Sequence, residues 1–470
     1  MPLQALLGKL SETMLIVMHQ IKHSFEIARW HHLLFRLAFG CGLLLINSAC
    51  DPLYPPESVQ PLERSPGIIT PVNSRPKISS VPGANSAGSN PGPELAPELR
   101  EDVALLRPYL RGNKNYGWQP GQLGKPEEFW NQRVNQKPVN SDSKAVTDYL
   151  SYVTRENKSD PTTELFARFD LGKKANNENY SIHVLEADAD TPRYDFTPRF
   201  DEFWRPHCDR IAMPVPPNGR LQGQPDYQCE GSGDCHLYVV DSSAGRVYEQ
   251  YRAHNPGPNR RKYLGGCTNV WDLRAIQPEN LRGLSCTSAN AAGIPYVPLL
   301  VTPGEIKRGV IRHALAFTMP NGFVERDRYA RPATHNPLVS VRWGKTVRGP
   351  GQPMRYGSHF RLKPEFNISP DWPPSLRVVL QALKDYGMYH IDGGPRLIVM
   401  TNDAFSPYHW DDPDIALNPR DLNEIADVSW KDFELISDQD AFGSMRRSDC
   451  NRRSVTERAK DVNTRPASAQ

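Results

Sequence analysis

The sequence predicts a mainly β protein whose body is an antiparallel β-sandwich or jelly-roll-like fold with one or two covering helices. Short runs rich in β-branched and aromatic residues recur between turns that contain Pro or Gly, as strands of such folds do. Their spacing does not suit the strand-helix alternation of repeated βαβ units. Only two segments, 143–155 and 373–386, are expected to form substantial helices, and the second has apolar residues on one face.

The clearest strand pair is 236–241 (HLYVVD) and 246–251 (RVYEQY). The small, Gly-containing segment 242–245 separates the two runs, which predicts a β-hairpin. Further strands are expected in the second half of the chain, at 269–273, 312–318, 339–343, 358–363 and 397–401.

An apolar run at 35–46 follows basic and aromatic residues near the amino terminus. It is shorter than the roughly 20 residues that span a bilayer, and it has the length of a signal-peptide core. The sequence 45–50 (LINSAC) resembles a bacterial lipobox, although Asn47 stands where an aliphatic residue is usual. We therefore expect export to the cell envelope and attachment to a membrane through a lipid on Cys50; plain secretion and an uncleaved anchor are the alternatives.

The composition predicts five regions along the chain. They are an export segment (1–50), a disordered Pro/Ser-rich tether (51–100), an N-terminal extension with one helix (101–198), the β-rich core domain (199–440) and a disordered basic tail (441–470). The formal net charge of +3 is small for 470 residues, and it gives no argument for a nucleic-acid partner.

Six of the eight cysteines follow the export segment and the proposed anchor. An even number of cysteines in an exported chain favours disulfides, and six cysteines allow 15 pairings, among which the sequence does not choose. No paired C-x-x-C spacing supports a zinc site. The disulfide candidates are Cys208, Cys229, Cys235, Cys267, Cys286 and Cys450.

Short segments occur in a specific order within a region that makes up about half of the chain. They include 214–218 (PVPPN), 236–241 with Tyr248-Glu249, 270–274 (VWDLR), 287–295 (TSANAAGIP), 305–306, 312–318 (RHALAFT), 331–335 (RPATH), 360–363 (FRLK), 380–387 (LQALKDYG), 410–412 (WDD) and 432–434 (DFE). In this pattern, residues 199–436 resemble a poorly characterised family of exported bacterial proteins. The resemblance implies an exported domain, often found near carbohydrate-associated modules, but no known activity. Family members commonly have Asp where this chain has Asn290.

Two carboxylates across a scissile bond are the requirement of a glycan hydrolase. Glu305 is the first candidate, with Asp241 or Asp272 as its partner, and His313 lies in the strand-like run that follows Glu305. Each has a structural alternative, because Asp241 begins a turn and a histidine in an apolar strand is commonly a hydrogen-bonded core residue. Ser288 is the one serine considered as a nucleophile, and it lacks the G-x-S-x-G context.

A polysaccharide lyase is the second enzyme hypothesis. Arg331, His335 and Arg361 would form a positive pocket for an acidic sugar, since guanidinium groups bind carboxylates through paired hydrogen bonds. Trp271 is a candidate for stacking on a sugar ring. Structural ion pairs and core packing are the alternatives for these residues.

No metal site or cofactor is expected, with calcium on the acidic segment Asp411, Asp412 and Asp414 as a weaker alternative. Together these features predict an exported, lipid-anchored envelope protein that acts on or binds polysaccharide. The alternative is a non-catalytic structural surface protein with a protein partner.

Overall fold

The structure is a computed structural model. It describes residues 122–156, 166–171, 182–198, 207–230, 233–255, 257, 263–337, 346–403, 408–437, 441–442 and 450–452. The chain divides into two compact units, 1–89 and 90–470, and every described residue belongs to the second. Strands outweigh helices, at 26% against 19%, and form several sheets, so the predicted mainly β class is confirmed.

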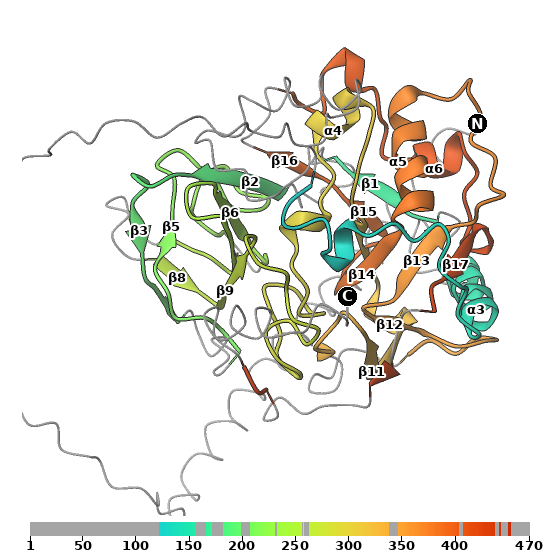
Figure 1. Ribbon diagram of the computed structural model, residues 1–470, viewed down its shortest axis with the longest axis horizontal. Coiled ribbons are helices and arrows are strands. Elements are labelled where there is room, and N and C mark those ends of the chain that lie inside the picture. Colours follow the sequence, from blue (N-terminus) through green and yellow to red (C-terminus); the bar gives the residue numbers. More distant parts are fainter. Residues whose placement is uncertain are drawn as a thin grey trace, which may run out of the picture. The chain divides into compact units, whose positions relative to one another are not determined.

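The larger main sheet has six strands in the order β1–β15–β10–β14–β13–β17. These are β1 (Arg168–Asp170), β15 (Leu397–Val399), β10 (Leu315–Met319), β14 (Met388–Gly393), β13 (His359–Leu362) and β17 (Phe433–Leu435). Figure 1 shows α5 (Pro374–Asp385) and α3 (Ser143–Glu156) beside this sheet. Both helices place buried apolar residues in its core, which confirms the two predicted helices.

The second main sheet has five strands in the order β16–β2–β6–β7–β9. These are β16 (Thr401–Asp403), β2 (Ile182–Ala187), β6 (Leu237–Asp241), β7 (Arg246–Tyr251) and β9 (Cys267–Asp272). β6 and β7 pair antiparallel, with Val239 opposite Tyr248, so the predicted hairpin is confirmed. β2 precedes residue 199 and yet lies between two other strands of this sheet.

The expectation of antiparallel sheets is met only in part, because both main sheets are mixed. The pairs β1·β15, β10·β14, β16·β2 and β2·β6 run parallel. Parallel neighbours need a long crossover connection. Here, strands far apart in the sequence pair with one another, as β10 does with β14 across some 70 intervening residues, and the spacing of neighbouring turns does not reveal such pairs.

Strand β6 is buried along its whole length because both faces of its sheet are covered. Tyr238 and Val240 face one apolar core, whereas Leu237 and Val239 face a second.

Three small sheets contain the remaining strands. They are formed by β3 (Arg193–Tyr194) with β5 (Met213–Pro214), β4 (Phe196–Pro198) with β8 (Tyr263–Gly265), and β12 (Met354–Tyr356) with β11 (Val324–Ala330) and β18 (Ala441–Phe442).

Short helices lie in the connections between strands. They are α4 (Pro303–Arg308), α6 (Asp421–Glu424) and the 3-10 turns η1 (Phe129–Asn131), η3 (Val297–Leu299), η4 (Asn321–Phe323), η6 (Pro413–Ile415) and η7 (Trp430–Asp432). Within the described ranges, no helix has both the length and the apolar character needed to cross a bilayer.

Several predictions concern segments outside the described residues. They are the export segment with Cys50, the tether at 51–100, most of the tail at 441–470 and the strand at 339–343. In the described part, the strands predicted at 269–273, 312–318, 358–363 and 397–401 are found with shifted ends as β9, β10, β13 and β15 with β16.

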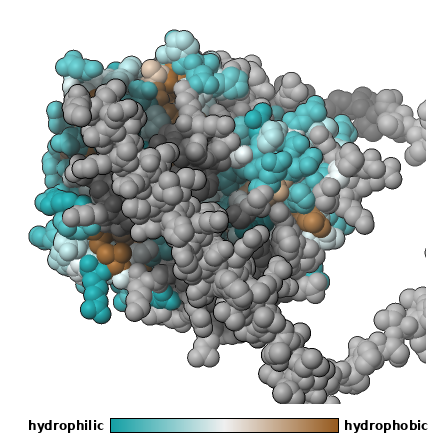
Figure 2. Space-filling view, turned by 180° about the vertical axis from the view of Figure 1, so that it is seen from behind, coloured by the Kyte–Doolittle hydropathy of each residue, from teal (hydrophilic) through white to brown (hydrophobic). Residues whose placement is uncertain are grey.

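The described surface in Figure 2 is mainly hydrophilic, with small and separate hydrophobic spots. The large apolar residues that are exposed in the described part lie far apart in the sequence: Val139, Tyr152, Ile211 and Ile425. The described part of the face in Figure 2 shows no large apolar patch of the kind expected for a docking surface.

Candidate functional site

A cavity of about 290 Å³ lies where residues of both main sheets meet. The six-stranded sheet contributes Asp170, Thr318 and Asp392, and the five-stranded sheet contributes Ile182 and Tyr251. The loop 287–291 and residues that precede β6 supply further walls. The cavity is therefore assembled from segments that are distant in the sequence, and it combines acidic, aromatic and amide side chains.

Asp392 stands at the end of β14, directly after a β-bulge. Phe317 of β10 pairs with His390, but the next residue, Thr318, pairs with Asp392, so Ile391 is the extra residue. Bulges of this kind change the direction of the side chain that follows them. The Asp392 carboxyl is half-buried and accepts a hydrogen bond from the Gly393 N–H at 2.8 Å.

The environment of Asp392 favours its protonated form. Burial is the main cause, and the negative charge of Asp234 is the second; together they raise the pKa of Asp392 to about 8. Hydrogen bonds from the backbone N–H groups of Gly393 and Ala291 oppose this shift. At neutral pH the group is therefore mostly a neutral carboxylic acid, which can donate a proton.

Asp234 supplies a second carboxyl group from a disulfide-closed loop. Cys229 and Cys235 are bonded to each other, and Asp234 directly precedes the second cysteine. Cys235 has a left-handed φ of 44°, which turns the chain sharply into β6. Asp234 is exposed and lines the cavity, so its carboxylate lies between the cavity and solvent.

Tyr296 lines the cavity from the start of η3. The buried carboxylate of Glu249 holds this position, because one oxygen accepts hydrogen bonds from the backbone N–H groups of Tyr296 (2.6 Å) and Val297 (2.9 Å). The other oxygen accepts from Trp271 Nε1 at 3.0 Å. Burial raises the pKa of Glu249 to about 7, and these hydrogen bonds limit the increase.

The Tyr296 side chain is only 4% exposed, and its hydroxyl has no hydrogen-bond partner among the described residues. Burial, followed by the charges of Asp392, Asp170 and Asp234, raises the pKa of Tyr296 well above its usual value. The hydroxyl is thus a neutral donor near several carboxyl groups, and it is available to a ligand.

His236 forms part of the same wall. Its Nδ1 contacts Gln222 Oε1 at 2.5 Å and its Nε2 contacts the Ala289 carbonyl at 2.8 Å. Burial lowers the pKa of His236, although Asp234 acts in the opposite direction. The imidazole is therefore engaged with the cavity loop and is not directed at a serine.

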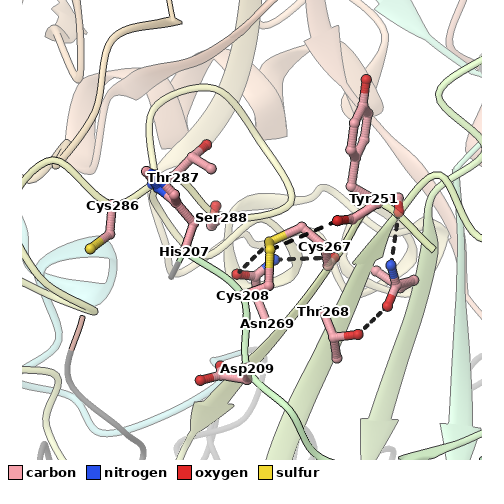
Figure 3. Close-up of a disulfide and its surroundings, with 12 residues drawn as sticks. His207, Cys208, Asp209, Tyr251, Cys267, Thr268, Asn269, Cys286, Thr287 and Ser288 are labelled. Carbon is pink, nitrogen blue, oxygen red and sulfur yellow. Dashed lines mark hydrogen bonds between the residues drawn. A yellow bond between two sulfur atoms is a disulfide. The ribbon is translucent and has the colours of Figure 1, made fainter. Parts of the chain in front are cut away.

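The cavity loop is fastened at several points. Cys286 is bonded to Cys450, and the buried Arg282 donates to the Thr287 carbonyl at 2.7 Å and to Asp209 at 3.2 Å. Figure 3 shows this segment near the bond between Cys208 and Cys267, with Tyr251 on the other side of that bond. Six cysteines thus form three disulfides, which confirms the predicted class of bond.

Ser288 and Asn290 line the cavity, but both are engaged within the loop. Ser288 Oγ donates to the Ile294 carbonyl at 3.2 Å, and no base contacts it in the part of the chain described. Asn290 donates to the same carbonyl at 2.6 Å and accepts from the Gly293 N–H at 3.1 Å. Asn290 is therefore a turn residue here.

Glu305 and His313 do come together, but away from the cavity walls. Glu305 closes a capping box with Thr302 at the start of α4, and its Oε1 lies 2.9 Å from His313 Nε2. Burial opposes both charges, yet the pair interaction outweighs it, lowering the pKa of Glu305 and raising that of His313. The two residues form a buried ion pair that holds α4.

The expected carboxyl partners of Glu305 are engaged elsewhere. Asp241 forms an ion pair with Arg193 and accepts from Ser243 Oγ (2.7 Å) within the hairpin turn. Asp272 forms an ion pair with Arg274. Burial raises the pKa of Asp272, but the interactions with Arg274 outweigh burial, so that the pKa is lowered overall. Neither lines the cavity.

The positive pocket expected for an acidic sugar is not assembled at the cavity. Arg331 forms an ion pair with Glu279, and Arg361 forms one with Glu434 at 2.9 Å. His335 Nδ1 contacts the Ala291 carbonyl at 2.9 Å, and Trp271 is fully buried against Glu249. None of these four residues is part of the cavity wall.

Among the described residues, the arrangement of His, Cys, Asp and Glu side chains does not support a metal site. The one close trio of candidate ligands among them is His207, Cys286 and Cys450, and the disulfide occupies both sulfurs. On the acidic segment considered for calcium, Asp414 pairs with Lys307 and Asp412 accepts the His409 N–H at 2.9 Å.

Comparison with known proteins finds no family model, no curated protein and no solved structure that matches this chain. The resemblance to an exported bacterial family therefore stays a prediction.

Proposed function

We propose that this protein is an exported envelope protein, lipid-anchored through Cys50, whose cavity hydrolyses a glycosidic bond of a polysaccharide. Three disulfides fit a protein outside the cytoplasm, where such bonds persist. On this proposal, the two main sheets pack as a sandwich whose junction holds the cavity.

The observation that carries the proposal is the difference between the two carboxyl groups of the cavity. Asp392 is half-buried with a pKa raised to about 8 by burial and by Asp234, whereas Asp234 is exposed to solvent. Glycosidases need one carboxylic acid to protonate the leaving oxygen and one carboxylate on the other side of the bond. Environments that separate two carboxyl groups in this way assign these roles.

In this mechanism, Asp392 donates its proton to the glycosidic oxygen as the bond to the anomeric carbon breaks. Asp234 stabilises the positive charge that develops on the sugar ring, either by direct attack or by accepting a proton from the attacking water. The Tyr296 hydroxyl donates a hydrogen bond to a sugar oxygen. Thr318 and the disulfide-closed loop position the two carboxyl groups from opposite sheets.

A binding module without turnover is the second candidate. Tyr251, Tyr296 and Tyr356 all line the cavity, and aromatic rings pack on the apolar faces of sugars. The lyase hypothesis has less support, because the described residues that line the cavity include no Lys or Arg to neutralise a uronate.

The test is incubation of the purified chain with a panel of bacterial and plant polysaccharides, with detection of new reducing ends and of ultraviolet absorbance from unsaturated products. We expect reducing ends without new absorbance, and loss of at least about a hundredfold in rate for Asp392→Asn. Asp414→Asn, which makes the same substitution at an exposed ion pair away from the cavity wall, is the control. Retention of a glycan without turnover would favour the binding module, and new absorbance would favour the lyase.

A further inference from the structure

Among the described residues, the side chains that line the cavity include acidic groups and no Lys or Arg. Asp234 contributes an exposed carboxylate, and no hydrogen bond or ion pair engages its side chain in the described part of the chain. Arg252 is close enough to help lower the pKa of His236, an effect dominated by burial, but Arg252 is not part of the wall. The described wall therefore favours a ligand with positive charge over an anion.

The aromatic lining points to the same kind of ligand. Tyr251, Tyr296 and Tyr356 line the cavity, and tyrosine rings attract ammonium groups. The Tyr251 ring already has a cationic neighbour, because the Arg252 guanidinium lies 5.8 Å from its centroid. Tyr296 is 4% exposed, and its hydroxyl has no partner among the described residues, so it is available to a ligand in the cavity. It can accept a hydrogen bond from an ammonium N–H or donate one to a sugar oxygen.

A metal cation is a weaker explanation of this acidity. No three carboxylate or imidazole ligand atoms of the cavity converge within 4.8 Å in the described part, as a close metal-binding cluster would require. A ligand with one positive charge spread over a larger body fits a site of about 290 Å³ that also contains rings and amides.

We propose that the cavity recognises a glycan unit that carries a free amino group, with its ammonium placed between Asp234 and the tyrosine rings. This inference rests on the proposed function and names the substrate class: a de-N-acetylated amino-sugar polymer. Asp392 keeps its role at the glycosidic oxygen, and the carboxylate of Asp234, which serves the anomeric carbon in the proposed reaction, also attracts the amine at C2 of the same ring.

The experiment compares three trisaccharides that share a β-1,4-linked backbone and differ only at C2: glucosamine, N-acetylglucosamine and glucose. Binding to the full chain is measured by calorimetry at about pH 6, where the amine is protonated. We expect the glucosamine trisaccharide to bind about tenfold more tightly than either neutral one. We also expect this preference to fall in roughly 0.5 M sodium chloride, where screening shortens the reach of charges.

Matched variants separate cavity charge from total charge. Asp234→Asn should remove the preference for the amine, whereas Asp414→Asn should keep it, because Asp414 is exposed and pairs with Lys307 away from the cavity wall. Tyr296→Phe should weaken binding of all three sugars. Equal or tighter binding of a neutral trisaccharide, or no binding of any, would overturn the inference.

Reducing-end release from the same sugars and from longer polymers distinguishes this inference from the proposed function. Preferential binding of the amine without cleavage would support amine recognition and overturn hydrolysis. Cleavage of neutral polymers with no preference for the amine would support hydrolysis and overturn amine recognition.

Discussion

The carboxylate of Glu249 lies 2.6 Å from the backbone nitrogen of Tyr296. Through this bond, a fully buried residue of β7 fixes Tyr296, the cavity residue that directly precedes η3. In the proposed function, Glu249 is therefore a positioning residue, and Tyr296 is the residue expected to contact the ligand.

Substitution Glu249→Gln tests this relationship. The amide has only one acceptor oxygen, so either the backbone of η3 or Trp271 Nε1 loses its partner. We expect a loss of stability of about 1–3 kcal/mol and weaker ligand binding. Chemical denaturation and Trp fluorescence measure the first effect and calorimetry the second. Unchanged binding in a destabilised variant would limit Glu249 to a structural role.

Tyr296→Phe should weaken ligand binding without reducing the stability of the protein. The hydroxyl has no partner among the described residues, so its removal should leave the melting temperature the same or slightly higher. Affinity for the preferred glycan should fall about fivefold, the value of one hydrogen bond. A large fall in melting temperature would contradict the description of this hydroxyl as unengaged.

Hydrolysis should decline as the pH rises through about 8, because Asp392 then loses the proton that the reaction needs. The rate at saturating polysaccharide, measured from about pH 5 to 9, checks this prediction, with the melting temperature followed in parallel to exclude unfolding. A rate that still increases above pH 8 would remove Asp392 from the role of general acid.

Stability should also fall with rising pH. Three carboxyl groups have folded pKa values raised mainly by burial: Asp392 and Glu128 to about 8, and Glu249 to about 7. In the pH range between the pKa values of these groups in the unfolded chain and their pKa values in the folded protein, the folded protein keeps protons that the unfolded chain has released. Stability is therefore lost as pH rises across this window, by at most about 1.4 kcal/mol per pH unit for each group.

Denaturant unfolding at pH values between about 5 and 8 measures this slope. Asp392→Asn and Glu128→Gln should each make the slope shallower, but only the first should abolish hydrolysis. Glu128 accepts the Gln277 N–H at 2.9 Å and lies outside the cavity wall, so it is the matched control.

Removal of His313 should destabilise the protein without a specific effect on catalysis. His313→Ala leaves the buried Glu305 without its positive partner, at a cost of about 3–5 kcal/mol. If this variant does not fold, His313→Gln keeps a neutral hydrogen-bond donor near Glu305. Loss of turnover in a variant of full stability would restore Glu305 and His313 as candidates for the reaction.

The disulfide Cys286–Cys450 should contribute more stability than Cys229–Cys235. The bonded residues are 164 apart in the first and 6 apart in the second, so chain-entropy arguments give about 5 and 2 kcal/mol. Unfolding of the paired Cys→Ser variants in denaturant tests this order. The short bond should matter more for ligand affinity, because it holds the loop of Asp234.

Local sequence signals predicted elements whose contacts lie nearby in the chain. The hairpin at β6 and β7 depends on two strand-forming runs around one short turn, and α5 depends on a periodic apolar face. The cysteine count predicted disulfides because an even number of thiols in an exported chain tends to pair. The partners, however, depend on distances in the folded chain, as with Cys286 and Cys450.

The sequence patterns did not predict the site. Both of its principal residues, however, lie in or near segments that were singled out from the sequence for other reasons. Asp234 belongs to CEGSGDC, where only the cysteines were considered, and Asp392 precedes Gly393 and Gly394 a few residues after the helix. Glu305, the preferred candidate, is a capping residue paired with His313. An Asp beside a constrained cysteine loop, or before a Gly pair at a strand end, was the available signal.

Local pattern and composition were enough to predict the mainly β class, the hairpin, the two longer helices and the tendency of the cysteines to pair. Which carboxyl groups share a cavity depends on contacts between distant parts of the chain, and these appear only in the folded protein. The parallel pairing of β10 with β14, and the loop closed by Cys229 and Cys235, bring Asp392 and Asp234 within reach of each other's charge. Burial and charge then set the pKa of Asp392, and both are properties of the folded chain.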